Sequence, residues 1–323
     1  MSGRSERLQQ IAEALLSAKS VAVCAHVDPD GDAMGSILGL THLLRSCGAT
    51  VTPVLASGES APATYMFLPG VEEFVPASES PEVDLVIALD APDPARLGDA
   101  RDLALGAQTL VVIDHHPDNK LYGTLNLVDD RAAATGEIIW ELLPYLDCVA
   151  DKRVATCLYT ALMTDTGRFS YGNTTPAALR RAAEMIEHGA DAAQLYQLVY
   201  ESRSPAALAL VARTLGRLAF ANAGRVAYSW IGPEDFIETG ALPEETENLI
   251  DEIRVVRDVD AVALLKSSHD SVRVSLRAKN GHDVGLVART LGGGGHSAAA
   301  GFTRAGTIES VLAELLALLP SAN

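Results

Sequence analysis

Short apolar runs that end abruptly in acidic or imidazole side chains mark the first half of the chain. Three of them occupy residues 21–25, 85–89 and 109–113, and each is rich in valine, leucine, isoleucine or alanine. Runs of this length and composition are typical of strands buried on both faces of a parallel sheet. The pattern therefore predicts a parallel sheet in which these three strands lie next to one another.

Apolar residues at helical spacing lie between these runs and after them. They predict an opening helix around residues 8–16, a helix that carries Met34 and Leu44 and stops at Gly48, and helices at residues 135–146 and 152–163. Residues 50–55 are a further strand candidate. Residues 56–82 contain four prolines, and we expect an irregular connection there with one short helix at residues 64–68.

The second half of the chain indicates a smaller α/β unit. Its patterns predict helices at residues 173–188, 192–200, 204–220, 244–255 and 308–319, and strands at residues 226–231, 259–266 and 272–277. A chain of 323 residues is long enough for two domains with separate cores. We therefore expect an α/β protein with a parallel-sheet domain at residues 1–190, a connection at 191–205 and a smaller α/β domain at 206–323.

Acidic and imidazole side chains gather at the ends of the three predicted strands and of one predicted helix. They are His26, Asp30, Asp32, Asp90, Asp114, His115, His116 and, at the helix end, Asp165. One aspartate after a strand is unremarkable because aspartate commonly caps helices, and residues 28–32 alone could form a solvated turn. The carboxyl ends of parallel strands meet at one edge, however, and converging carboxylates repel one another unless cations neutralise them. We therefore expect a metal centre.

The chemistry of these side chains indicates the kind of metal. Carboxylates and imidazoles without a thiolate suit manganese or magnesium better than structural zinc. Six ligands are too many for one ion that keeps a coordination position open, but they suit two ions that share a bridging carboxylate. Two such ions activate water and neutralise phosphoryl oxygens in phosphoester hydrolysis.

A run of four glycines, Gly292 to Gly295, precedes His296 and forms the second chemical feature. Glycines let backbone N–H groups approach an anion closely, and the small residues that follow would permit a tightly packed helix start. A flexible loop is the alternative, although the apolar residues after His296 disfavour it. We expect phosphate binding here, with Arg277 as the nearest candidate cation; an ordinary exposed arginine is the alternative for Arg277.

Charge and cysteine content narrow the classes of function. The formal net charge is −17, which argues against a protein that holds long nucleic acid by its phosphates. Small phosphorylated ligands remain compatible with it. The four cysteines have no CxxC spacing, so we expect reduced core residues. Without a membrane-spanning run or a signal peptide at the amphipathic N-terminus, the sequence favours a soluble, cytoplasmic protein.

The order and spacing of these motifs resemble the DHH phosphoesterase superfamily over nearly the whole chain. The resemblance rests on His26-x3-Asp30-x-Asp32, on Asp90, on Asp114-His115-His116 and on Asp165, while Gly292 to His296 resembles the signature of the DHH-associated C-terminal domain. Within the superfamily the chain is most similar to two-domain bacterial members of the RecJ-like nanoRNase type, which also remove the 3′-phosphate from phosphoadenosine phosphate. Ser297 departs from the basic residue that many relatives carry after the histidine.

The resemblance implies a role for each motif residue. His26 and Asp30 would bind one divalent ion, Asp32, His115 and Asp165 the other, and Asp90 would bridge them. Asp114 would orient His115, and His116 would face the substrate phosphate. Gly293, Gly294, Gly295, His296 and Arg277 would contact substrate from the second domain, so that the active site lies in the cleft between the domains. Manganese is the favoured metal, with magnesium or cobalt as alternatives.

We therefore expect a cytoplasmic, manganese-dependent hydrolase of short RNA or DNA oligonucleotides and small nucleotides. The sequence does not decide between a monomer and a homodimer. A cyclic di-AMP phosphodiesterase is the main alternative because it would use the same metals. An inorganic pyrophosphatase, which would share only the N-terminal motifs, and a processive exonuclease, which would need more basic surface, are less favoured. A catalytically silent nucleotide-binding regulator would lack metal ligands, yet each expected ligand position is filled.

Overall fold

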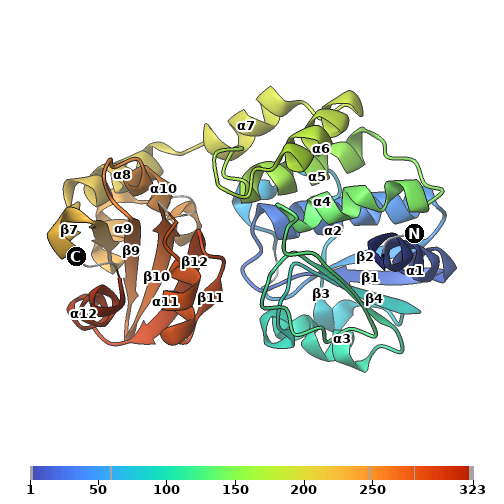
Figure 1. Cartoon of the computed structure of the whole chain (residues 1–323), viewed down its shortest axis with the longest axis horizontal. Coiled ribbons are helices and arrows are strands. Elements are labelled where there is room, and N and C mark those ends of the chain that lie inside the picture. Colours follow the sequence, from blue (N-terminus) through green and yellow to red (C-terminus); the bar gives the residue numbers. More distant parts are fainter. Residues whose placement is uncertain (1–2, 59, 247–248, 280, 320–323) are drawn as a thin grey trace. The chain divides into compact units, whose positions relative to one another are not determined.

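The computed structural model describes residues 3–58, 60–246, 249–279 and 281–319. The chain forms two compact units, Met1–Glu201 (unit 1) and Ser202–Asn323 (unit 2), and each is built on its own six-stranded sheet (Figure 1). The predicted α/β class is confirmed.

Unit 1 contains a parallel sheet with the strand order β3-β2-β1-β4-β5-β6. Its strands are β1 Ser20–Cys24, β2 Thr50–Leu55, β3 Val75–Pro76, β4 Leu85–Leu89, β5 Leu110–Asp114 and β6 Leu125–Val128. The three strands predicted from apolar runs, β1, β4 and β5, are neighbours at the centre, and every residue of β4 and β5 is buried. Their carboxyl ends therefore meet at one edge of the sheet.

Helices cover both faces of this sheet (Figure 1). They are α1 Gly3–Ser17, α2 Gly31–Ser46, α3 Arg101–Gly106, α4 Thr135–Glu141, α5 Lys152–Asp165, α6 Pro176–Glu187 and α7 Ala192–Tyr200. The larger hydrophobic cluster joins α1, α2, α4 and α5 to one face, and a smaller cluster joins α3 and the 3-10 segment Pro94–Ala100 to the other. Every residue of α2 from Gly31 to Leu44 is buried, so α2 is the central helix of the unit.

A stripe of glycines on α2 allows α5 to approach it closely. A Cβ atom at Gly31 would lie 2.4 Å from the Thr164 side chain, and one at Gly35 would lie 2.4 Å from the carbonyl oxygen of Cys157. A Cβ atom at Gly39 would likewise lie 2.5 Å from Leu158. These three positions are four residues apart and share one face of the helix. This close packing carries the end of α5 to the start of α2.

Unit 2 contains a mixed sheet with the order β11-β12-β10-β9-β8-β7, in which only the β8–β9 pair is parallel. Its strands are β7 Ala219–Ala221, β8 Val226–Ile231, β9 Ala261–Ser268, β10 Ser271–Ala278, β11 Gly294–Gly295 and β12 Ala299–Ala305. Its helices are α8 Pro205–Gly216, α9 Pro233–Thr239, α10 Leu249–Arg254, α11 Val284–Thr290 and α12 Ile308–Leu318. The helices α8 and α10 pack on one face, and α11 and α12 pack on the other.

The glycine run forms a hairpin, and the expected helix start after it is wrong. Gly294 and Gly295 pair with Gly301 and Ala300 as antiparallel strands. Two positions of the hairpin require glycine. A Cβ atom at Gly293 would lie 2.1 Å from the carbonyl oxygen of Gly301, and Gly295 has a φ of +125°, which residues with a side chain rarely adopt. The residues after His296 are small because they enter a strand beside β10, where backbones pack tightly. The flexible-loop alternative is also excluded.

Three predicted helices are shorter in the structure. The helix expected at residues 135–146 ends at Glu141, because Pro144 lacks an N–H and lies in the separate 3-10 segment Leu143–Tyr145. The helix expected at 204–220 ends at Gly216, where the chain turns into β7. Of the helix expected at 244–255, the described residues show the 3-10 segment Pro243–Thr246 and α10, while residues 247–248 lie outside the description.

The expectation that all four cysteines are reduced is wrong for one pair. Cys47, at the end of α2, is joined to Cys148 by a disulfide, with the two Cα atoms 5.1 Å apart. The sequence could not indicate this pair because its members lie 101 residues apart and meet only in the folded unit. Cys24 and Cys157 are free and buried, as expected.

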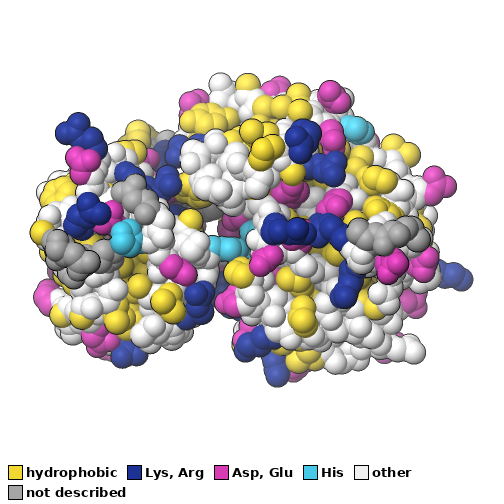
Figure 2. Space-filling model, in the orientation of Figure 1, with side chains coloured by type: hydrophobic (Ala, Val, Ile, Leu, Met, Phe, Trp, Pro, Cys, Tyr) yellow, Lys and Arg dark blue, Asp and Glu magenta, His cyan; other side chains and the backbone are white. Residues whose placement is uncertain are grey.

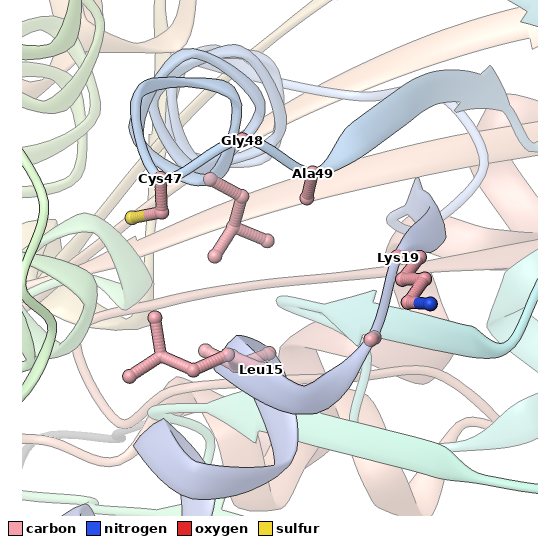
Figure 3. A pocket seen from close by; sticks show the side chains of 8 residues that line it. Leu15, Lys19, Cys47, Gly48 and Ala49 are labelled. Atoms are coloured by element: carbon pink, nitrogen blue, oxygen red, sulfur yellow. The ribbon is translucent and has the colours of Figure 1, made fainter.

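A cavity of about 170 Å³ lies beside Cys47, between the C-terminal ends of α1 and α2 (Figure 3). Leu15, Lys19, Gly48 and Ala49 also line it, and none of its lining residues belongs to the predicted metal centre. The cavity is therefore distinct from the chemistry at the carboxyl ends of the strands.

The surface carries both signs of charge. On the face shown in Figure 2, Lys and Arg side chains are interspersed with Asp and Glu. Among the residues that the structure describes, no helix combines the length and the apolar character that crossing a membrane requires.

Candidate metal centre

Six predicted metal ligands from unit 1 converge at the carboxyl edge of the parallel sheet. They come from the loop after β1 and the start of α2 (His26, Asp30, Asp32), from the ends of β4 and β5 (Asp90, His115) and from the end of α5 (Asp165). The loops after neighbouring parallel strands bring the first five together. The close packing of α5 on α2 brings the sixth.

The ligands form two groups that share Asp90. In the first group, Nε2 of His26 lies 3.8 Å from Oδ1 of Asp30 and 3.5 Å from Oδ2 of Asp90. In the second group, Nε2 of His115 lies 3.4 Å from Oδ1 of Asp90. The two oxygens of the Asp90 carboxylate therefore face different groups, which is the arrangement expected of a carboxylate that bridges two ions.

Asp32 and Asp165 complete the second group. Nε2 of His115 lies 3.6 Å from Oδ2 of Asp32 and 3.6 Å from Oδ2 of Asp165. All these separations exceed the usual 2.7–3.2 Å of an N–H···O hydrogen bond, so the polar atoms surround common points without being optimally bonded to one another. Oxygen and imidazole donors in this arrangement fit divalent cations such as manganese or magnesium.

The electrostatics of the cluster show a shortage of positive charge. Burial and nearby carboxylates raise the pKa of Asp32, and they raise that of Asp165 to about 6. Burial acts to lower the pKa of His26 and His115, but the surrounding carboxylates outweigh it and raise both values well above normal. Several side chains of the cluster therefore bind protons more strongly than usual. Divalent cations would neutralise the same excess of negative charge.

Backbone carbonyls fix which nitrogen of each ligand imidazole faces the carboxylates. Nδ1 of His26 lies 2.7 Å from the carbonyl oxygen of Val27, and Nδ1 of His115 lies 3.4 Å from that of Ala132. A proton on Nδ1 leaves the Nε2 lone pair for a metal ion.

The start of α4 holds Asp32 in place, and this support was not predicted from the sequence. The backbone N–H groups of Thr135 and Gly136 donate to the two oxygens of Asp32 at 2.7 and 3.0 Å, and the Ser36 hydroxyl donates at 2.9 Å. The Thr135 hydroxyl also donates to Oδ1 of Asp90 at 3.2 Å. Two of these four donors are main-chain N–H groups, which carry no side-chain signal in a sequence.

Asp90 has a left-handed backbone conformation with φ 52°. Its N–H still donates to the Ile113 carbonyl on β5, which continues the strand ladder by one bond. Such a conformation is costly for a residue with a Cβ atom, although aspartate tolerates it better than most. The chain therefore turns sharply at the residue whose carboxylate joins the two ligand groups.

Asp114 contacts a different histidine ring from the one that the resemblance implied. Its Oδ1 lies 2.8 Å from Nδ1 of His116, and it accepts from the backbone N–H of His115, also at 2.8 Å. The amide of Asn119 donates to Oδ2 of Asp114 at 2.6 Å. Asp114 ends β5 and is fully buried, so its carboxylate lies under the turn that follows and orients His116.

The candidate substrate-binding residues of unit 2 lie around the β10–β12–β11 strands. Arg277 on β10 is opposite Ala299 on β12, and β12 pairs on its other side with Gly294 and Gly295. Nε of Arg277 lies 3.5 Å from Oδ1 of Asp251, so the guanidinium has an acidic neighbour within the unit. The N–H of His296 donates to the Ala299 carbonyl and closes the hairpin. Gly293 precedes β11 in the same turn.

Comparison with known proteins is consistent with this geometry. Residues 20–162 match the DHH family, N-terminal domain, and residues 223–321 match the DHHA1 domain. The bifunctional oligoribonuclease and PAP phosphatase NrnA of Thermus thermophilus is 34% identical over 304 residues, covering 93% of this chain and 89% of that protein. The Bacillus subtilis protein of the same name is 31% identical over 285 residues, covering 85% and 86%.

A solved structure supports the fold over the whole chain. The crystal structure of an exopolyphosphatase-related protein from Bacteroides fragilis has a TM-score of 0.89 with 22% identity, covering 97% of this chain and 96% of that one. The order of the two matched domains agrees with the order of the two units. From the domain matches, the full-length relatives and the converging ligand motifs together, we conclude that this chain belongs to the DHH family and carries a DHHA1 domain after its DHH domain.

Proposed function

We propose that the protein is a metal-dependent phosphoesterase that hydrolyses short oligonucleotides and removes the 3′-phosphate from 3′-phosphoadenosine 5′-phosphate. The observation that carries this proposal is the pair of ligand groups that share Asp90, in a chain whose relatives over nearly their full length are named for these two activities. The net charge of −17 also suits substrates with few phosphates.

Two divalent cations would be held in unit 1. His26 and Asp30 would hold one, Asp32, His115 and Asp165 the other, and Asp90 would bridge them; manganese is the favoured metal. When bound, such cations neutralise phosphoryl charge and lower the pKa of a coordinated water.

His116 would act on the substrate phosphate. Burial lowers its pKa, but the Asp114 carboxylate at 2.8 Å outweighs that effect and raises it, so the imidazole holds a proton more firmly than usual. With Nδ1 bonded to Asp114, Nε2 is the nitrogen that can donate to a phosphoryl or leaving oxygen. Asn119 fixes the other oxygen of Asp114 and so keeps the pair aligned.

Unit 2 would supply further phosphate contacts. Arg277 and His296 provide side-chain donors, and the backbone at Gly294 is open to a close approach, since a Cβ atom there would meet nothing within 4 Å. These residues lie on or beside the neighbouring strands β10, β12 and β11 of the unit, which supports a shared role in substrate binding.

A panel of substrates tests the proposal directly. Purified protein with manganese would be offered pApA, a longer RNA, phosphoadenosine phosphate, cyclic di-AMP and pyrophosphate side by side. We expect pApA and phosphoadenosine phosphate to be hydrolysed with the highest kcat/KM. Preferred hydrolysis of cyclic di-AMP or pyrophosphate would replace the proposed substrate class, and no hydrolysis of any member would contradict the proposal.

A further inference from the structure

The segment that follows the metal ligand Asp165 has an unusual backbone. Three consecutive residues, Gly167, Arg168 and Phe169, have left-handed φ angles of 54°, 63° and 59°. Two of them carry side chains, for which this conformation is unfavourable. A run of this kind persists only where surrounding contacts fix it.

Hydrogen bonds fix this turn onto the end of α5. The N–H of Arg168 donates to the Met163 carbonyl at 2.8 Å, and the N–H of Phe169 donates to the Thr166 hydroxyl at 3.1 Å. The amide of Asn173 donates to the carbonyls of both Asp165 and Ala133, at 3.0 and 3.1 Å. The turn is therefore rigidly connected to the metal ligand and to the loop before α4.

The turn directs an exposed arginine onto an aromatic ring. Cζ of Arg168 lies 4.9 Å from the centroid of the Tyr200 ring, at the end of α7, and the Tyr196 ring lies 5.4 Å from that of Tyr200. Within the described ranges, Arg168 makes no ion pair with a carboxylate, in contrast to Arg131 and Lys120 on other loops of unit 1, which pair with Asp129 and Asp93. Stacking fixes the plane of the guanidinium and leaves its N–H edge as a donor.

We propose that Arg168 binds the non-reacting phosphate of the substrate, which rests on the proposed function. The two proposed substrates, pApA and phosphoadenosine phosphate, both carry a second phosphate one nucleoside away from the phosphorus that reacts. Arg168 lies three residues after a metal ligand, so its Cα is at most about 11 Å from that of Asp165. A planar guanidinium without a carboxylate partner can bind such a phosphate through two parallel N–H···O bonds.

This assignment gives the metal-bearing unit its own means of selecting substrates. The cations recognise any phosphoester, whereas Arg168 would favour those with a 5′-phosphate on the nucleoside at the reacting bond. Arg277 in unit 2 differs because it already has Asp251 as a neighbour. With Arg168 in this role, the preferred substrates would be nucleotides in which one nucleoside carries both the reacting phosphate and a second phosphate.

The test compares substrates with and without the second phosphate. The kcat/KM ratios pApA/ApA and phosphoadenosine phosphate/3′-AMP would be measured for wild type, Arg168→Ala and Arg168→Lys, with Arg131→Ala as a matched control for loss of an exposed positive charge. We expect Arg168→Ala to reduce both ratios by about 10- to 100-fold, mainly through KM. Both ratios should lie between those of wild type and Arg168→Ala in Arg168→Lys, and they should equal those of wild type in Arg131→Ala.

Two results would overturn the assignment. Wild-type kcat/KM values for all four substrates in Arg168→Ala would show that Arg168 makes no phosphate contact. Equal losses on both members of each pair, together with a lower Tm, would show that the arginine only holds the turn against Tyr200.

Titration with 5′-AMP and adenosine separates this inference from the proposed function. If wild type hydrolyses none of the substrates, the proposed function fails, but a loss of 5′-AMP affinity of about 10-fold in Arg168→Ala, with adenosine affinity unchanged, would still support the phosphate contact. Equal affinities for 5′-AMP in the two proteins would overturn it.

Discussion

At the scale of single residues, Asp90 connects the two ligand groups. Its two oxygens lie 3.5 Å from Nε2 of His26 and 3.4 Å from Nε2 of His115, and its backbone is left-handed. Burial disfavours its charge, yet the two imidazoles hold its pKa well below normal. Its negative charge is therefore central to both groups.

Replacing Asp90 with asparagine should abolish turnover while the fold remains. An amide has nearly the same shape and tolerates the same backbone conformation, but it lacks the charge that two cations would share. Substitution of residues that only support metal ligands commonly lowers metal affinity by 10- to 100-fold. Asp90 would itself be a ligand, so we expect Asp90→Asn to lower metal affinity by at least about 100-fold. Metal content, measured on protein with an unchanged circular dichroism spectrum, checks this; full metal content in Asp90→Asn would contradict the bridging role.

His116→Ala should separate catalysis from metal binding. The proposed role of His116 is toward phosphate, so the variant should retain its metal and lose rate by roughly 10²- to 10⁴-fold. The measurement is kcat beside metal content for the two variants. Equal metal loss in His116→Ala and Asp90→Asn would mean that the roles are divided wrongly.

The convergence of the candidate ligands could be predicted from the sequence because their signal is local. Each aspartate or histidine directly follows a buried apolar run or begins or ends a helix, and the convergence then follows from parallel topology. The supporting donors were missed for a physical reason. Thr135 and Gly136 act through backbone N–H groups, and the Asn119 and Asn173 side chains find their partners only in the folded unit.

At the scale of elements, the contact between α2 and α5 brings Asp165 to the other candidate ligands. The glycine stripe permits this contact, and Gly35 is its tightest point against backbone because a Cβ atom there would lie 2.4 Å from the Cys157 carbonyl oxygen. Apolar spacing predicted both helices, but it could not predict that they touch along glycines.

Gly35→Ala should lower stability and disturb the second ligand group. The added methyl group forces the two helices apart, and overpacking of this kind costs about 1–3 kcal/mol. Gly106→Ala is the matched control, since Gly106 ends α3 and a Cβ atom there meets nothing within 4 Å. Thermal unfolding should give a lower Tm for Gly35→Ala and an equal or slightly higher Tm for the control; equal Tm values in both variants would refute close packing at Gly35.

The elements that sequence reasoning missed are short or half-exposed. β6 has four residues, of which only Leu127 is buried, so it shows no apolar run. α9 and α11 have seven residues each, too few for a clear helical period. The glycine hairpin was missed because its residues have no side-chain pattern, and its strand pairing depends on β10 as a partner for β12.

At the scale of the whole molecule, charge should limit the length of substrate. With a net charge of −17, each further phosphate of a bound chain meets a surface that repels it on average. Salt screens this repulsion, because the Debye length falls from about 10 Å at 0.1 M to about 3 Å at 1 M.

The preference for short over long RNA should therefore become weaker as salt is added. The kcat/KM ratio of a dinucleotide to an RNA of about twenty nucleotides would be measured at low and high potassium chloride. We expect the ratio to fall with salt. A ratio that rises steeply with salt would instead indicate a basic track that binds the longer chain.

Unit 2 should contribute to substrate binding without affecting the metals. Arg277→Ala or His296→Ala should raise KM for pApA, each lost charge-assisted contact costing about 1.5–3 kcal/mol, and should leave metal content unchanged. Unchanged kinetics for pApA and for longer RNA in both variants would assign the glycine hairpin a purely structural role.

The parallel topology of unit 1 also has a consequence for the order in which the protein acquires its site during synthesis. The loop after β1 carries the first candidate ligands, but the neighbouring strand β4 is made about sixty residues later, and the α4 donors to Asp32 lie 103 residues away in sequence. Such non-local pairing is slow and must await the later segments. A nascent chain that stops before α5 would contain five of the six candidate ligands yet lack both Asp165 and the helix contact that places it. The ligand set of the second cation would then be complete only in the finished unit, so that binding of this cation would report completion of folding.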